Sequence, residues 1–549
     1  MKGWQETRGP VFELTRQFVA RMFDSELFAA SGRWRGAAIG AFSLLPVAGL
    51  VFQDPRMAAR YQRLARTAPD TFRAAMLTDE TGRMLLFLAI AGLLGVLQWQ
   101  SLLPSRRDYL ALASLPVRPP QVFMARFLAL SLFSLGAVTA LVALPSLMAP
   151  HAAARAVTSA LACFFALFSM VALQATLLNL VPNRVYARVS AYVQGLAAAV
   201  FFLAALESWH LGNIPGLLSD YAWAPPVWFV ALDHVLAGDA AISMQALALR
   251  ALVALVAAVA LALTGYSLSY WRYRSLLLEG QGAVAAPVAR RWSLAAMLVR
   301  NPQRLAVLDF MDKTLSRSRT HRLVLLGYGG MALGFLINSV LLALAAAHWD
   351  LDWNKIFAFM TLYWPLTASM ILIPGMRHTL SLPVELGANW IFRINESGGR
   401  MQWMRAVETF VALYAIAPVY ILLVPAAVLT LGWGLALRMA AMQALASLAI
   451  FEMLFYSWQQ LPFTCSYAPG KKPLSSIVGR YLAAIFFLAP ALSIMIATVS
   501  RLTSLFAFYA LAFAAFWLWM RHRRREGWGE TRLIYEDEPE ALADLGLRG

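Results

Sequence analysis

The sequence has 549 residues, of which 60% are hydrophobic and 14% are charged, and its formal net charge at pH 7 is +17. With a mean hydropathy of +0.62, it carries more apolar surface than a soluble globular protein of this length can bury, which excludes a soluble enzyme or binding module. The two cysteines, Cys163 and Cys465, imply neither a disulfide framework nor redox chemistry.

The apolar residues form blocks of about 20 residues, the length at which a helix crosses the hydrocarbon core of a bilayer. The first 36 residues carry Lys2 and five arginines without an early apolar core, so we expect no cleaved signal peptide. The blocks predict an all-α, polytopic membrane protein of about 12 transmembrane helices. The first six predicted spans cover residues 37–52, 84–100, 122–148, 156–181, 187–206 and 247–270. The other six cover residues 323–347, 356–376, 406–431, 439–458, 476–499 and 502–520.

An even number of spans places both termini on one side of the membrane, and most of the 46 Lys and Arg residues then lie on that side. Because cytoplasmic loops carry the excess of Lys and Arg, we expect both termini in the cytoplasm and the chain in the inner (plasma) membrane. Contact with anionic membrane lipids explains this basic charge better than nucleic-acid binding does. The predicted parts are a first six-helix half, a basic cytoplasmic linker, a second six-helix half and an acidic tail, over residues 1–275, 276–322, 323–525 and 526–549.

The predicted outer loop at residues 54–83 departs from this charge pattern because it holds six arginines. Arg56, Arg60 and Arg63 would share one helix face there. That face suits a helix lying on lipid headgroups, and it also suits a vestibule for an anionic substrate. A re-entrant first segment, which would change the number of spans, is a further alternative.

The two halves look duplicated. The tetrapeptide at residues 114–117 recurs at residues 381–384, and each copy lies in the cytoplasmic loop between the second and third span of its half. An amphipathic stretch precedes each half, and we expect both stretches to be helices lying flat at the cytoplasmic surface. Because six is an even number, both halves cross the membrane in the same sense. We therefore expect two pseudo-symmetric units in parallel orientation, related by an axis along the membrane normal. The apolar residues of the two stretches are Val11, Leu14, Phe18 and Met22, then Leu305, Leu308, Met311 and Leu315.

Few residues in the sequence suggest catalysis. No metal-ligand motif is present, and residues 468–472 lack the first glycine and the Ser or Thr of a phosphate loop. We therefore expect no enzyme activity and no metal or other cofactor bound by this chain. Glu408 and Glu452 are charges inside predicted spans and are functional candidates for that reason. We expect Glu408 to pair locally with Arg405, and Glu452 either to face a cavity or to pair with a cation such as Arg480.

An aromatic and proline-rich outer segment lies between the fifth and sixth spans. Residues 207–244 contain no Lys or Arg, and Pro225, Pro226 and Trp228 lie at their centre. The composition is typical of an aromatic anchor at the membrane interface. The alternative is a re-entrant outer gate.

Residues 107–117, followed by Arg126 at the head of a span, resemble the coupling segment of ABC-2 type exporter permeases. Residues 224–229 are similar to that family's segment before its last span, and the six-span unit behind an interfacial helix fits the same family. The resemblance covers the first half better than the second, because residues 385–390 begin a longer run to the next span.

The resemblance implies a permease that exports a substrate and is driven by a separate cytoplasmic ABC ATPase, expected as a dimer, which supplies the ATP chemistry. That partner would dock on the two repeated loops, where a rigid helix beginning at proline offers an equivalent surface in each half. The coupling residues implied are Ser114, Leu115, Pro116, Val117, Arg118, Leu382, Pro383, Val384 and Glu385.

Other functions fit the same composition. An ion-coupled secondary transporter would use Glu452 as a coupling group. A membrane-embedded transferase acting on lipid-linked substrates would hold a phosphate on Arg56, Arg60 and Arg63. A structural membrane scaffold also agrees with the sequence.

Overall fold

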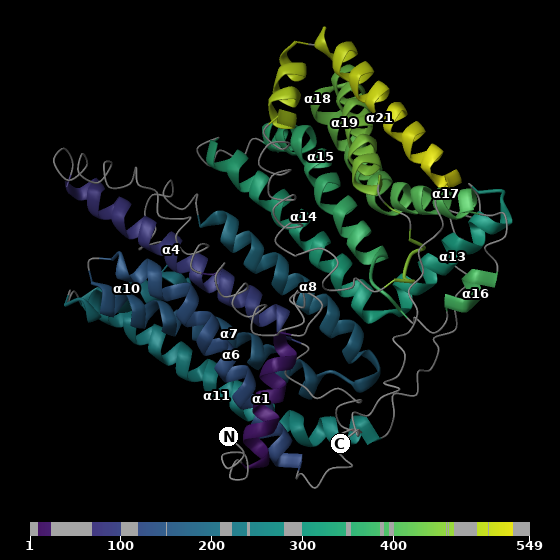
Figure 1. The fold of residues 1–549 in the computed structure, drawn as a ribbon. Helices are drawn as coiled ribbons and strands as arrows, with labels where there is room; N and C mark the ends of the chain where they lie inside the picture. Colours follow the sequence, from purple (N-terminus) through teal and green to yellow (C-terminus); the bar gives the residue numbers. More distant parts are fainter. Residues whose placement is uncertain are drawn as a thin grey trace. The chain divides into compact units, whose positions relative to one another are not determined.

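The computed structural model shows a chain whose regular elements, in the described residues, are almost all helices (Figure 1). The described residues are 9–23, 45, 69–99, 119–149, 151–208, 222–238, 242–278, 299–346, 353–384, 389–394, 400–456, 458, 460–465, 491–502 and 504–530. The chain forms two compact units. The first unit comprises Met1–Val284 with Pro469–Leu474, and the second comprises Ala285–Ala468 with Ser475–Gly549.

Helix α7 is central to the first unit, because it packs against α4, α6, α10 and α11. Small residues permit this close packing: Ala162, Cys163 and Ala166 of α7 are buried in one cluster with Phe87 of α4 and Phe229 of α10. The described helices are α1 (Pro10–Phe23), α4 (Pro69–Leu97), α6 (Pro119–Leu147), α7 (Ala152–Leu180), α8 (Asn183–Glu207), α10 (Pro225–Leu236) and α11 (Ile242–Leu278).

The second unit is built around α19, which packs against α15, α18 and α21. Its described helices are α13 (Pro302–Arg317), α14 (Arg319–Ala346), α15 (Trp353–Leu380), α16 (Asn389–Ile394), α17 (Arg400–Val411), the π-helical turn η3 (Ala412–Ile416), α18 (Ala417–Leu431), α19 (Trp433–Phe455) and α21 (Leu505–Glu530). A shorter apolar helix spans Ala491–Arg501. The π turn precedes Pro418, which has no N–H to donate, and the N–H of Ala417 bonds to the carbonyl of Ala412 five residues back.

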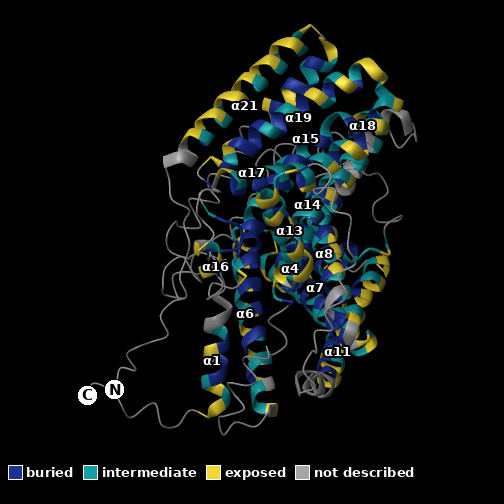
Figure 2. Cartoon of the chain, turned by 90° about the vertical axis from the view of Figure 1, so that its right-hand side faces the viewer, coloured by how far each residue is buried: buried dark blue, intermediate teal, exposed yellow. Residues whose placement is uncertain are grey.

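Among the described residues, ten helices are long and apolar enough to cross a membrane. Each corresponds to one of the twelve predicted spans. The prediction of an all-α chain is confirmed for the described residues, and its apolar helices agree with a multi-pass membrane protein. The number of twelve spans and the pseudo-symmetry of the halves stay predictions. The predicted span at residues 37–52, apart from Leu45, and most of that at residues 476–499 lie outside the described residues. In α21 half of the apolar residues at positions 505–520 are exposed and none is buried, as expected of a helix that faces lipid (Figure 2).

The start of α4 differs from the prediction. Residues 54–83 were expected to form an outer loop, but the helix already begins at Pro69, and Thr78, Glu80 and Thr81 are buried in it. Glu80, one of the charged residues that made this stretch resemble a loop, has partners in other helices, described below.

Both predicted amphipathic stretches are helical, but their apolar faces contact protein. Leu14 and Phe18 of α1 pack against Ala125 and Ala129 of α6. The apolar side of α13, with Met311 fully buried, packs into the core of the second unit against α17. Neighbouring helices therefore cover much of both apolar faces, and the position of α1 and α13 at the cytoplasmic surface stays a prediction.

Candidate functional site

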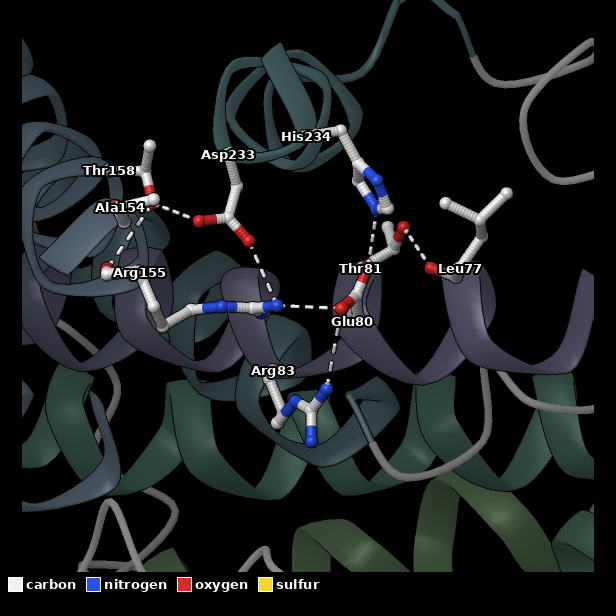
Figure 3. Close-up of polar contacts among 9 residues, drawn as sticks. All are labelled: Leu77, Glu80, Thr81, Arg83, Ala154, Arg155, Thr158, Asp233 and His234. Carbon is white, nitrogen blue, oxygen red and sulfur yellow. Dashed lines mark hydrogen bonds and ion pairs between the residues drawn. The ribbon is translucent and has the colours of Figure 1, made fainter. Parts of the chain in front are cut away.

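An ionic cluster joins three helices of the first unit, and we call it the α4/α7/α10 cluster. Arg155 of α7 lies between two carboxylates (Figure 3). Its Nη2 is 2.6 Å from Oε1 of Glu80 and 2.8 Å from Oδ2 of Asp233. His234 Nε2 is 2.7 Å from Oε2 of Glu80 on the other side. The cluster consists of Glu80 and Arg83 of α4, Arg155 and Thr158 of α7, and Asp233 and His234 of α10.

The burial of these groups makes their pairing obligatory. The side chain of Glu80 is 3% exposed, that of Asp233 6% and that of Arg155 12%. A charge removed from water is tolerated only when it is paired and hydrogen-bonded. Arg155 also lies in the first turn of α7, where the helix dipole disfavours a cation, so the two carboxylates offset an unfavourable position.

The hydrogen bonds of Asp233 depend on a shared hydroxyl. Thr158 Oγ1 lies 3.0 Å from Oδ1 of Asp233 and 2.9 Å from the carbonyl oxygen of Ala154. The hydroxyl has one proton, so it donates to only one of these oxygens at a time. Burial raises the pKa of Asp233, while the Arg155 guanidinium acts in the opposite direction. Asp233 is therefore the carboxylate of this cluster whose charge is held least firmly.

None of these six residues was identified as a site from the sequence. Two signals could have found them. Arg155 is the one charged residue in the apolar stretch 152–180, and Asp233 and His234 lie in a segment without Lys or Arg. Their meeting with Glu80 requires the packing of α10 against α4 and α7.

The outer gate candidates lie on the helix that carries Asp233 and His234. Pro225 and Pro226 begin α10, where a missing N–H costs no intrahelical bond. Pro226 is buried, and Trp228 donates from Nε1 to the carbonyl oxygen of Ala222 at 2.8 Å. The prolines and the tryptophan thus fix the start of α10, and the ionic cluster fixes its end.

The second copy of the repeated tetrapeptide is a surface segment with a firmly held backbone. Leu382 is buried, while Val384 is 53% exposed. The Val384 N–H donates to the Phe463 carbonyl at 3.2 Å, and the Phe463 N–H donates to the Leu380 carbonyl at 3.0 Å. Nε2 of His321 lies 3.1 Å from the Leu382 carbonyl oxygen. Phe463 has φ of 68°, a left-handed conformation that is rare for an aromatic residue and marks a constrained position.

The first copy of the tetrapeptide lies outside the described residues, as do Arg118 and Glu385, the two charged residues among the implied coupling residues. These residues are Ser114, Leu115, Pro116, Val117, Arg118 and Glu385. Arg56, Arg60 and Arg63 also lie outside the described part of the chain.

Glu452 of α19 is buried in an ion pair. Nε of Arg524, on α21, lies 2.7 Å from its Oε2, although neither atom makes a well-aligned hydrogen bond. The same Arg524 side chain donates from Nη2 to Glu408 of α17. Arg525 and Arg521 approach Glu408 at 3.3 and 3.8 Å.

The expectation that Glu408 pairs with Arg405 is wrong. The partners of Glu408 come from α21, more than 100 residues further along the chain. Arg480, the cation suggested for Glu452, lies outside the described residues.

Within the described residues, no group of three or more His, Cys, Asp and Glu side chains is placed to hold a metal ion. Comparison with protein-family models, with curated proteins and with solved structures finds no match for this chain.

Proposed function

We propose that this chain is the membrane-spanning permease subunit of an ATP-driven, ABC-type exporter, with ATP hydrolysis on a separate cytoplasmic ATPase. The geometry of Leu382, Pro383 and Val384 carries the proposal. Their backbone is bonded to other elements, and the Val384 side chain is exposed. An element that transmits motion from a soluble motor needs both properties, a surface for the partner and a rigid connection to the membrane helices.

The connection reaches several helices of the second unit. His321 near the start of α14 contacts the Leu382 carbonyl, and Phe463 bonds to Leu380 at the end of α15. Asn389 of α16 donates to the carbonyl of Thr464 at 2.7 Å. A push on Val384 would therefore act on α14, α15 and α16 together. In the first half, residues 114–118 would offer the second docking surface to a dimeric ATPase.

With the termini in the cytoplasm, the ends of α4, α7 and α10 that carry the ionic cluster face the outer side. We propose that α10 is the outer gate and that the α4/α7/α10 cluster holds it closed. Opening would separate Asp233 from Arg155 and His234 from Glu80. Arg155 would still keep Glu80 as a partner, so the charge of its guanidinium would stay compensated.

The test is co-purification of the ATPase with two matched variants. Val384→Asp places a charge on the proposed docking surface without touching a buried side chain. Gln303→Asp adds the same charge to the exposed first turn of α13. We expect Val384→Asp to lose the ATPase partner and Gln303→Asp to keep it, both at wild-type abundance in the membrane. Equal recovery of the ATPase with both variants would overturn the docking assignment.

Two other outcomes would support the alternative functions. Transport that continues on an ion gradient after ATP depletion would indicate a secondary transporter. Loss of a lipid-linked product in a variant lacking Arg56, Arg60 and Arg63, with normal membrane insertion, would indicate the transferase.

A further inference from the structure

Several arginines gather at the end of the second unit that is predicted to be cytoplasmic. Arg304 of α13 lies close enough to Arg405 of α17, and to Arg521 and Arg525 of α21, for their charges to act on it. The carboxylates of Glu408 and Glu452 are the acidic partners at this place. We call this group the arginine cluster: Arg304, Arg405, Arg521, Arg524 and Arg525.

The two carboxylates leave much of this charge uncompensated. Arg524 takes the closest positions on both of them. The Nε atoms of Arg304, Arg405, Arg521 and Arg525 are buried without a hydrogen-bond partner in the described chain. Arg304 does bond to Thr409 through Nη2, but a hydroxyl does not neutralise it. Five guanidinium groups around two carboxylates, with several unused donors, form a site that attracts a further anion.

The arginines from α21 lie at the depth of lipid headgroups. They follow directly on the apolar part of the helix, where Phe508 is 66% and Leu511 70% exposed, as expected for contact with lipid chains. Arg521 lies over the ring of Trp517, at 4.9 Å from its centroid. Tryptophan is enriched at the interface between hydrocarbon and water, so the guanidinium groups just beyond it reach the phosphate layer.

We propose that the arginine cluster binds the phosphate headgroup of an anionic membrane lipid through Arg304, Arg405, Arg521 and Arg525. The planar guanidinium fork matches phosphate oxygens in pairs of parallel hydrogen bonds. A lipid reaches this place by lateral diffusion along the exposed side of α21, whereas a soluble anion must arrive from the cytoplasm. The lipid would tie α13, α17 and α21 together. The inference is independent of the proposed function, because it requires neither an ATPase nor transport.

Native mass spectrometry of the purified full chain tests the site. The probes are dioctanoyl phosphatidylglycerol, its zwitterionic phosphatidylcholine counterpart, and glycerol phosphate, which carries the headgroup phosphate without chains. We expect the wild type to bind the anionic lipid at least about tenfold more tightly than either of the others. Equal binding of the two lipids would overturn the proposal. Glycerol phosphate bound as tightly as the anionic lipid would show a soluble-anion site instead.

Variants test whether the anionic lipid binds at the arginine cluster. The double variant Arg405→Gln/Arg521→Gln removes two cations that no carboxylate holds tightly, and we expect about tenfold weaker binding of the anionic lipid. Arg501→Gln, at the exposed end of the helix Ala491–Arg501, removes a charge outside the cluster and should leave binding unchanged. Arg405→Lys/Arg521→Lys keeps the charge and should retain part of the affinity. Wild-type affinity in the glutamine double variant, with an unchanged elution profile, would rule out the assignment.

Discussion

Arg155 of α7 lies 2.6 Å from Glu80 of α4, a residue 75 positions earlier in the chain, and both side chains are almost completely buried. This pair fixes one end of the first unit, because the same guanidinium also holds Asp233 on α10. The arrangement agrees with a start of α4 before its apolar block, because Arg155 and His234 of other helices compensate the buried charge of Glu80.

Loss of Arg155 should be the most damaging single change in this cluster. Arg155→Met leaves Glu80 and Asp233 buried without their common cation, and we expect a loss of about 3 kcal/mol or more. Thermal unfolding in detergent, followed by circular dichroism, measures it. Arg250→Met, at an exposed arginine of α11, is the control and should cost little. Similar unfolding temperatures for the two variants would contradict the role of the cluster.

Asp233→Asn should be milder than Arg155→Met. The amide still accepts a hydrogen bond from Thr158, and Arg155 keeps Glu80. Because burial raises the pKa of Asp233 in the folded protein, its contribution to stability is full below the ordinary aspartate pKa and is lost as the pH rises through the raised value. The wild type should therefore lose stability relative to Asp233→Asn as the pH increases. A difference that stays constant with pH would contradict the raised pKa, because it would show that Asp233 has the same pKa in the folded and the unfolded protein.

Glu452 and Arg524 should behave as a coupled pair. Single variants Glu452→Gln and Arg524→Gln should each destabilise the second unit, Arg524→Gln more because it also leaves Glu408 without its closest partner. In a double-mutant cycle we expect a coupling energy of about 1 to 3 kcal/mol. Additive effects would show that the pair contributes nothing. Loss of transport in Glu452→Gln at normal stability would instead support an ion-coupling role.

Close approach of α4 and α8 depends on Gly92. A Cβ atom at this position would overlap the ring of Phe201, so Gly92→Ala should push the helices apart and cost about 1 to 3 kcal/mol. The matched control is Gly327→Ala in α14, where a Cβ would meet nothing within 4 Å. The unfolding temperatures of the two variants provide the comparison. Equal unfolding temperatures for Gly92→Ala and Gly327→Ala would contradict a close contact between α4 and α8 at Gly92.

The sequence predicted the helices well and their charged partners poorly. Apolar blocks of spanning length are a local signal, so all ten described spans could be found from composition. The early start of α4 was missed because Asp79, Glu80 and Arg83 are typical of a loop unless distant partners are known. Glu452 was recognised because a carboxylate inside an apolar block is unusual. Its partner Arg524 lies 72 positions further along the chain, in a basic run that served only to predict the side of the membrane.

We have proposed that a separate soluble ATPase drives this chain. The most direct measurement is gentle extraction of the tagged protein, followed by mass spectrometry of whatever co-purifies with and without a non-hydrolysable ATP analogue. We predict a soluble protein with a phosphate loop in stoichiometric amount, retained more fully with the analogue. A folded preparation that carries no such protein under either condition would contradict the claim.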